Sequence, residues 1–356
     1  MFLKHLHVLY FKNIEDKQLD FSKKFIAFVG NNGIGKTNVL DSIYYLSMTK
    51  SYFSSTEVQN IQFGKEFFVI YGKFENQGMD MEVSCSVRKS EGKQVLLNQK
   101  PYPKITEHIG KIPVVIITPQ DLYLITEYAD TRRKFLDALI SKFDKDYLNA
   151  LIQYNKALQQ RNALLKQEEN VYQQMDLLDI YGLQMAQYGE MILNKRKLFF
   201  EEVKEKVKKT YSQLQNSNEL LELNYISTIQ NDYFKELQNS IPKDIRLGYT
   251  SLGIHRDDFE ILLNGYAAKN FASQGQQKTI IIALKWLELL HIFQKTNVCP
   301  ILLLDDIYDK MDDQRLNQFV DLLNADFIKQ VFVTDTNKER ILKLFNTQNV
   351  EIFEMK

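Results

Sequence analysis

A glycine-rich loop of the form G-x4-G-K-T is the feature that most restricts what this chain can fold into. It follows an apolar run, residues 25–29, and precedes residues 38–47, where apolar side chains recur at helical spacing. In that setting the backbone N–H groups of the loop can surround phosphate oxygens, and the N-terminus of the following helix adds a partial positive charge. The sequence therefore predicts an α/β fold with a site for a nucleoside triphosphate. The residues expected around the phosphates are Gly30, Asn31, Asn32, Gly33, Ile34, Gly35, Lys36 and Thr37.

Side chains from both ends of the chain are expected to serve this site. Lys36 can reach the β- and γ-phosphates, and Thr37 offers a hydroxyl to Mg²⁺. Far along the chain, the apolar run 301–304 ends in Asp305 and Asp306. A parallel strand places such acids at its carboxyl end, where the phosphate loop also opens. We therefore predict that Asp305 holds Mg²⁺, directly or through water, and that Asp306 orients or deprotonates the attacking water. The expected ligands are ATP and Mg²⁺.

A third element is the segment Ser273–Gln277, at the start of a helix expected over about 275–294. A serine with a glycine two residues later at this position is by itself an ordinary helix N-cap. Combined with the phosphate loop and the acidic strand end, Ser273 and Gly275 predict a signature element that closes on the γ-phosphate bound by another subunit.

The pattern of prolines and apolar residues predicts how the chain is divided. Residues 120–241 contain no proline, and their apolar side chains recur at helical spacing but without sustained heptads. Before this window the chain reads as mostly strands, and after it strands alternate with helices, which is typical of a parallel sheet. We expect one ATPase head from 1–121 and 242–356, and an inserted, mainly helical domain at 122–241 that forms a compact lobe.

Charge and composition limit the possible partners. The chain has 45 basic and 45 acidic residues, so contact with nucleic acid requires a local basic face. The lysines in 204–209 alternate with glutamates and fit a solvated, salt-paired helix. The denser cluster Arg132–Lys134 could either contact DNA or serve the fold. Two cysteines far apart in sequence, no apolar run of membrane-spanning length and no secretory signal predict a cytoplasmic protein.

Taken together, the motifs resemble the ATP-binding-cassette (ABC) head family related to SMC proteins. The nucleotide motifs are GNNGIGKTN at 30–38, SQGQQ at 273–277 and LLLDD at 302–306. Other stretches resemble the bacterial recombination mediators of that family, so that the resemblance covers nearly the whole chain. These stretches are LYFKNI at 9–14, RRKFLD at 132–137, RNALLK at 161–166 and GIHRDD at 253–258.

The resemblance implies a switch more than a turnover enzyme. ATP would be held between Lys36 and Thr37 of one subunit and Ser273 and Gly275 of its partner, and so would stabilise a homodimer. The dimer would clamp double-stranded DNA near gaps and junctions with single-stranded DNA. Slow, weak and DNA-dependent ATP hydrolysis would release the clamp, and RecR- and RecO-like mediators would be partners in recombinase loading.

Some positions depart from the family pattern. Residues 309–312 stand where related heads carry a Ser-x-Leu-Asp loop, and Asp335 stands where transporter heads place a switch histidine, which leaves the γ-phosphate sensor open. The loop Gly253–Asp258 could hold a metal, lie near the nucleotide or be a hydrogen-bonded structural loop, and the last two are favoured.

Other ATPases remain as alternatives. A transporter ATPase subunit is disfavoured by the SQGQQ segment and by the long insertion. An SMC-type ATPase with long arms would need a longer insertion, and an ATPase with an attached nuclease would need more chain after the last strand.

Overall fold

The computed structural model describes residues 1–54, 56–167, 174–215, 219–307, 313–345 and 349–355. The chain forms two compact units: unit 1 is Met1–Asp121 with Ile281–Lys356, and unit 2 is Leu122–Ile280. The expected boundary after residue 121 coincides with this division, but the second falls at Ile281 instead of 242. The reason is that β9 (Leu221–Ile226) pairs antiparallel with β10 (Asp258–Leu263), which keeps the intervening chain in unit 2.

Unit 1 is built on a five-stranded parallel sheet in the order β14-β3-β13-β12-β8. Every residue of β3, β8, β12 and β13 is buried, as expected of parallel strands covered on both faces. The two neighbours of β3 both come from the C-terminal part of the chain. The predicted head made from both ends of the sequence therefore has a common sheet. Its strands are β3 (Phe25–Val29), β8 (Val114–Ile117), β12 (Ile301–Leu304), β13 (Val331–Asp335) and β14 (Val350–Glu354).

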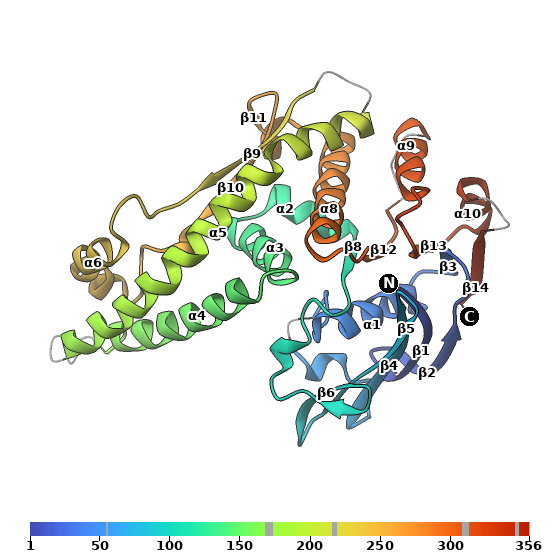
Figure 1. Ribbon diagram of the computed structural model, residues 1–356, viewed down its shortest axis with the longest axis horizontal. Helices are drawn as coiled ribbons and strands as arrows, with labels where there is room; N and C mark the ends of the chain where they lie inside the picture. Colours follow the sequence, from blue (N-terminus) through green and yellow to red (C-terminus); the bar gives the residue numbers. More distant parts are fainter. Residues whose placement is uncertain (55, 168–173, 216–218, 308–312, 346–348, 356) are drawn as a thin grey trace. The chain divides into compact units, whose positions relative to one another are not determined.

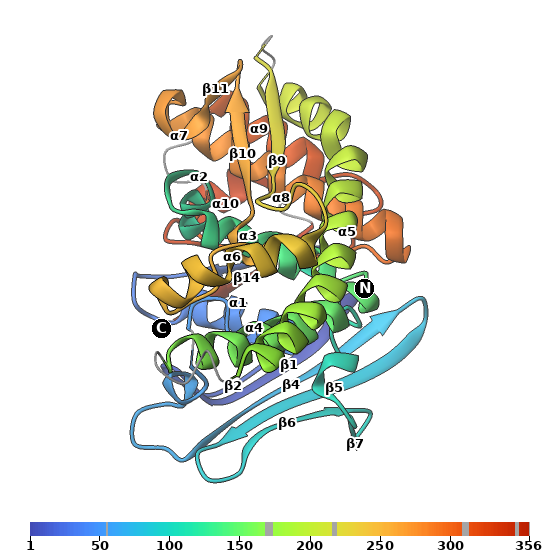
Figure 2. The same cartoon turned by 90° about the vertical axis from the view of Figure 1, so that its left-hand side faces the viewer.

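An antiparallel sheet in the order β2-β1-β4-β5-β6-β7 completes unit 1, and Figure 2 shows its long strands side by side. Helix α1 (Lys36–Met48) contacts strands of both sheets and is buried on nearly all sides. The buried side chain of Gln330 joins the sheets, because its amide accepts from the N–H of Leu3 and donates to the Leu3 carbonyl, at 2.7 and 2.9 Å. The strands are β1 (Phe2–Phe11), β2 (Ile14–Asp20), β4 (Phe67–Asn76), β5 (Met79–Arg88), β6 (Gly92–Leu97) and β7 (Lys100–Pro101).

The C-terminal part of unit 1 alternates strands with helices, as the sequence predicts. The helices are α9 (Asp313–Leu323) and α10 (Lys338–Leu344), together with most of α8 (Gln274–Thr296), within which the division between the units falls.

Unit 2 is mainly helical, and in it α4 packs along α5 (Figure 1). At one end of this pair, Leu164 and Leu165 of α4 lie in one apolar cluster with Leu178 of α5. The 41 residues of α5 span about 60 Å at 1.5 Å per residue. The helices are α2 (Tyr123–Thr126), α3 (Ala129–Ser141), α4 (Lys145–Leu165), α5 (Met175–Gln215), α6 (Tyr233–Leu247) and α7 (Ala268–Phe271).

Two features of unit 2 were not expected from the proline-free, mainly helical window. Strand β9 lies inside it and forms a three-stranded sheet with β10 and β11 (Tyr266–Ala267) in the order β11-β10-β9. Helix α6 continues through Pro242 to Leu247, so this proline does not end the helical region. None of the helices in the described parts of the chain combines the length and apolar character needed to cross a membrane.

Candidate nucleotide-binding site

The glycine-rich loop joins β3 to α1, as predicted. Gly35 caps α1 without any side-chain hydrogen bond, and the first turn contains no acid, so nothing on the helix itself neutralises its positive end. Gly33 and Gly35 have φ values of 80° and 106°, which favour glycine. At Gly35 a Cβ atom would also lie only 2.8 Å from the side-chain oxygen of Asn13. The loop therefore has the backbone of a phosphate cradle.

Asn13, in the turn between β1 and β2, supports this loop from outside. Its amide Nδ2 donates to the carbonyl of Gly33 (3.1 Å), and its Oδ1 accepts from Nδ2 of Asn38 in α1 (2.7 Å). Asn13 therefore links the loop to the helix that follows it. The sequence shows this asparagine only as part of a family-like segment, and no local pattern indicates its role.

Lys36 lies over the loop with only 5% of its surface exposed. Its ammonium donates to the carbonyls of Gly30 (2.8 Å) and Asn31 (3.0 Å), the two residues that open the loop. The charge is therefore held at the concave side of the loop, and its use as a phosphate ligand remains a prediction.

Thr37 and Asp305 are 268 positions apart in sequence, yet their side chains are in direct contact. The Thr37 hydroxyl donates to the Asp305 carboxylate, at 2.9 Å from Oδ1 and 3.1 Å from Oδ2. Octahedral Mg²⁺ binds oxygens at 2.0–2.1 Å, which places neighbouring ligands roughly 2.9 Å apart. A hydroxyl and a carboxylate with this spacing fit the predicted magnesium site, because hard oxygen donors are what Mg²⁺ prefers.

Thr334, at the end of β13, fixes both tandem aspartates. Its hydroxyl donates to Oδ1 of Asp305 (2.8 Å) and accepts from the backbone N–H of Asp306 (3.0 Å). Asp306 has a φ of 45°, a conformation that few residues other than glycine adopt, so this hydrogen bond stabilises an unusual turn. The sequence analysis overlooked Thr334. The available signal was a polar residue at the end of an apolar strand that lies between the loop strand and the acidic strand.

Burial raises the pKa of the Asp305 carboxyl above its ordinary value. The hydrogen bonds from Thr334 and Thr37 act in the opposite direction, and the neighbouring charge of Asp306 raises the pKa further. A folded-state pKa above the unfolded value means that the folded protein binds more protons in the intervening pH range. Ionisation of Asp305 therefore costs stability as the pH rises through that range, and the cost persists at neutral pH.

The Asp305→Asn variant is therefore expected to be more stable than the unchanged protein when no nucleotide is present. Calorimetry at pH 7 should show a midpoint of unfolding higher by a few degrees, with a smaller decrease between acidic and neutral pH. The same variant should lose magnesium-dependent ATP binding. A midpoint equal to or below that of the unchanged protein would show that the buried carboxylate is not destabilising.

Asp335 lies next to the loop, because its carbonyl accepts from the N–H of Gly30 at 3.3 Å. Its carboxylate, however, accepts from the N–H of Asn337 (2.7 Å) and pairs with Arg340 (3.5 Å), which organises the start of α10. The structure thus gives this carboxylate a local partner within its own turn. The segment 309–312 lies outside the described residues.

The signature residues Ser273 and Gly275 belong to unit 2. The Ser273 hydroxyl accepts from the N–H of Gln276 (3.3 Å), and the Gln276 side chain accepts from the N–H of Ser273 (2.7 Å). This reciprocal pair is a capping box that fixes the start of α8. Gln276 is itself held by Glu219, to which its amide donates at 2.6 Å.

The loop Gly253–Asp258 is hydrogen-bonded into unit 2. His255 contacts the hydroxyl of Tyr154 (2.7 Å) and the carbonyl of Thr250 (3.1 Å), and burial lowers its pKa to about 4, so the ring is neutral. Among the described residues, no group of three or more histidine, cysteine or acidic side chains could hold a metal ion. The geometry fits the favoured structural interpretation of this loop.

Arg132 and Arg133 belong to the cluster that could either contact DNA or serve the fold, and both are engaged inside unit 2. Arg132 forms a two-point ion pair with Asp258 (2.7 and 2.8 Å), and Arg133 donates to the carbonyl of Asp257 (2.7 Å). Both side chains are largely buried, which favours a role in the fold for these two arginines. In the other cluster, Lys208 pairs with Glu205 at 3.2 Å, as expected of a salt-paired helix.

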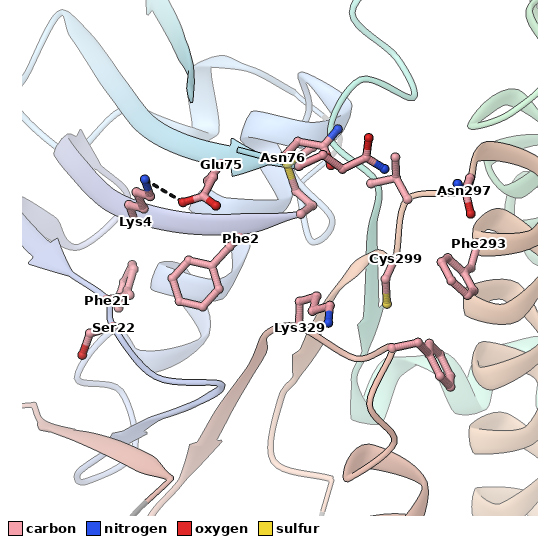
Figure 3. Close-up of a pocket in the computed structure, with 14 residues that line it drawn as sticks. Phe2, Lys4, Phe21, Ser22, Glu75, Asn76, Phe293, Asn297, Cys299 and Lys329 are labelled. Carbon is pink, nitrogen blue, oxygen red and sulfur yellow. Dashed lines mark ion pairs between the residues drawn. The ribbon is translucent and has the colours of Figure 1, made fainter. Parts of the chain in front are cut away.

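A cavity of about 920 Å³ lies at the other end of the parallel sheet (Figure 3). Its lining includes Cys299 and Lys329, which precede β12 and β13, and apolar side chains such as Phe2 and Phe293. The glycine-rich loop opens at the opposite, carboxyl edge of the same strands. This cavity of unit 1 is therefore separate from the candidate nucleotide site.

Comparisons with known proteins agree with this architecture. The family model for the RecF/RecN/SMC N terminal domain matches residues 2–356. A DNA replication and repair protein RecF from Flavobacterium johnsoniae is 42% identical over 359 residues, with 100% of both chains covered.

Solved structures give the same result. The structure of "the recombination mediator protein RecF-ATPrS in RecFOR pathway" is similar with a TM-score of 0.89 and 31% identity, and the match covers 100% of this chain and 96% of that one. At the level of fold alone, an SMC head bound to the C-winged helix domain of ScpA gives a TM-score of 0.58 with 14% identity, covering 100% and 95%. The predicted ABC-type head fold with an inserted helical region is confirmed, and the chain belongs to the RecF family.

Proposed function

We propose that this protein is an ATP-dependent DNA-binding switch of bacterial DNA replication and recombinational repair. The observation that carries the proposal is the contact between Thr37 and Asp305, which joins the two ends of the chain at one phosphate-binding loop. The relatives support the biological setting, since one is named as a DNA replication and repair protein and another as a recombination mediator with an ATP analogue.

The side chains divide the chemistry among them. Lys36 would exchange its two loop carbonyls for β- and γ-phosphate oxygens, which leaves its charge where it already lies. Thr37 and Asp305 would hold Mg²⁺, which neutralises charge on the phosphates. Asp306, positioned by Thr334, would orient the attacking water next to the γ-phosphate. Weak, DNA-dependent hydrolysis in the cytoplasm is the proposed activity.

A second copy of the chain would complete the nucleotide site. Ser273 and Gly275 of one copy would close on the γ-phosphate held by the other, so that ATP stabilises a homodimer and hydrolysis releases it. ATP shifts this equilibrium only through contacts that the dimer makes and the monomer does not, and the shared γ-phosphate supplies them. The dimer would clamp double-stranded DNA near gaps and single-strand junctions, with RecR- and RecO-like mediators as partners.

DNA binding should therefore require ATP and weaken steeply as salt rises, because the contacts are to phosphates. Mobility shifts on duplex and gapped DNA, with and without ATP and over a range of salt, test this expectation. Tight binding by the nucleotide-free protein that is flat across salt would contradict the clamp.

The Asp306→Asn variant should separate binding from hydrolysis. It keeps Lys36, Thr37 and Asp305, so we expect ATP-dependent dimerisation and DNA binding to persist while ATP turnover falls at least about tenfold, within the range of a lost general base. Phosphate release in the presence of DNA measures the turnover. Unchanged turnover would remove Asp306 as the residue that activates water. The matched control is Asp321→Asn, because Asp321 is an exposed acid of α9.

A further inference from the structure

The two adjacent aspartates after β12 would point to opposite faces of the sheet if the strand simply continued. Successive side chains of an extended strand alternate between the two faces, so Asp305 and Asp306 cannot both reach one ligand from a regular strand. The proposed chemistry needs both carboxylates at the same triphosphate, Asp305 at Mg²⁺ and Asp306 at the attacking water. The backbone at Asp306 must therefore depart from the strand conformation.

Asp306 does leave the extended conformation. Its φ is 45°, whereas residues of a parallel strand have a φ of about −120°. Because φ is the rotation about the N–Cα bond, this difference of about 165° moves the Cβ atom of Asp306 towards the face that Asp305 occupies. The left-handed region is unfavourable for residues that carry a Cβ atom, so the turn depends on the contacts that hold it.

Thr334 supplies such a contact. Strands β12 and β13 are parallel with Leu304 beside Val333, so the register places Thr334 next to Asp305 at the end of the sheet. The Thr334 side chain is fully buried, and its hydroxyl accepts from the backbone N–H of Asp306 at 3.0 Å. The threonine on the neighbouring strand therefore holds the first atom of the left-handed turn.

Asp305 is anchored independently of Thr334. Its backbone N–H donates to the carbonyl of Ile117 at the end of β8 (2.9 Å), and its carboxylate also accepts from the Thr37 hydroxyl (2.9 Å). Loss of the Thr334 hydroxyl would therefore leave Asp305 with two of its anchors. The turn at Asp306 would lose the hydrogen bond that holds its N–H.

We propose that Thr334 is a positioning residue for hydrolysis, which holds the left-handed turn at Asp306 and so brings two consecutive carboxylates to one face of the sheet. This inference rests on the proposed roles of Asp305 and Asp306, and it adds the residue that makes those roles compatible. The Thr334 hydroxyl donates to Asp305 and accepts from Asp306, so the threonine acts on the reaction through Asp306 and not by touching the nucleotide.

Thr334→Val removes the hydroxyl at nearly constant volume and tests this role. ATP turnover with DNA present should fall at least about tenfold, as for a lost general base, while the KM for ATP changes less than about threefold. Thr334→Ser keeps the hydroxyl and should restore turnover. Thr118→Val is the matched control, because Thr118 is also a buried residue at a strand end, but its hydroxyl bonds to Asp121 (3.2 Å). Its turnover should be unchanged.

A double-variant cycle separates positioning from a general loss of structure. If Thr334 acts through Asp306, Thr334→Val should cost nothing further in the Asp306→Asn background, so the double variant should be as slow as Asp306→Asn alone. A further tenfold loss would overturn the proposal, as would normal turnover by Thr334→Val. Normal turnover by Asp306→Asn would instead mean that the proposed catalytic role of Asp306 itself fails.

Thermal unfolding without nucleotide gives a second readout that does not depend on turnover. Glycine tolerates the left-handed region and alanine does not, so Asp306→Gly should unfold at a higher temperature than Asp306→Ala. In the Thr334→Val background the turn can relax, and this difference should shrink. An equal difference in both backgrounds would show that Thr334 does not hold the turn and would overturn the proposal. The absence of any difference in the otherwise unchanged protein would overturn it as well.

Discussion

The Lys36→Ala variant is expected to stay monomeric at ATP concentrations that dimerise the unchanged protein. Lys36 supplies the one buried ammonium at the opening of the described loop, where it already holds two carbonyl oxygens. Hydrogen bonds to charged groups contribute roughly 1.5–3 kcal/mol each, so the loss of two should weaken ATP binding at least about a hundredfold. Fluorescent-nucleotide titration measures the binding, and sedimentation with and without ATP measures the dimer.

Lys24→Ala is the matched control for this experiment. Lys24 also donates to a backbone carbonyl, that of Ala325 at 3.0 Å, but it precedes β3 whereas Lys36 follows it. Its removal should leave ATP binding intact. An undiminished ATP-induced dimer in the Lys36→Ala variant would mean that the loop is not the triphosphate site.

The second large effect is expected at a buried ion pair of unit 1. Lys285 of α8 lies 2.8 Å from the carboxylate of Asp121, and their side chains are 3% and 1% exposed. Burial on its own would lower the pKa of Lys285, but Asp121 and Glu288 raise it above the ordinary value, so the ammonium stays charged. Asp121 also accepts from the Tyr52 hydroxyl (2.5 Å) and the N–H of Thr118 (2.6 Å).

Replacing Lys285 with methionine keeps the apolar stem but leaves Asp121 charged and buried. Breaking one side of a buried pair costs about 3–5 kcal/mol, which would be a large share of the stability of a typical domain. Urea unfolding of Lys285→Met measures the loss, and the double variant Lys285→Met/Asp121→Asn should recover much of it.

Lys338→Met is the surface control for this prediction. Lys338 and Glu354 are just as close, at 2.6 Å, but their side chains are 51% and 55% exposed. Solvent screening limits such pairs to about 1 kcal/mol or less. If Lys285→Met were no more damaging than Lys338→Met, the buried pair would not be what joins α8 to the end of the N-terminal part of unit 1.

Local patterns in the sequence were sufficient to predict which elements meet at the candidate nucleotide site. The glycine loop, the buried strand before it and the acidic strand end are each readable within about ten residues, and their meeting follows from the rules of parallel sheets. The structure brings Thr37 and Asp305 together at 2.9 Å, as those rules require. The element order after residue 300 was predictable for the same reason.

Features that depend on distant partners were not predictable. Strand β9 alternates buried and less buried residues, but its partner β10 lies beyond α6, and the proline-free window favoured helix. For the cluster Arg132–Lys134 the sequence left DNA contact and a role in the fold open, because nothing nearby in sequence reveals that Asp258 forms an ion pair with Arg132. Asn13 and Thr334 act across elements whose contact only the fold creates.

The position of β3 in its sheet has a consequence for biosynthesis. Both strands that hydrogen-bond to it, β13 and β14, leave the ribosome roughly 300 residues after it. At 5–20 residues per second, this apolar strand waits roughly 15–60 s with both edges open. Open strand edges invite pairing with other chains, so the nascent protein depends on shielding of β3 until β13 and β14 have been synthesised. Chaperone depletion should therefore lower the yield of this protein more than the yield of proteins whose central strands pair with strands close by in sequence.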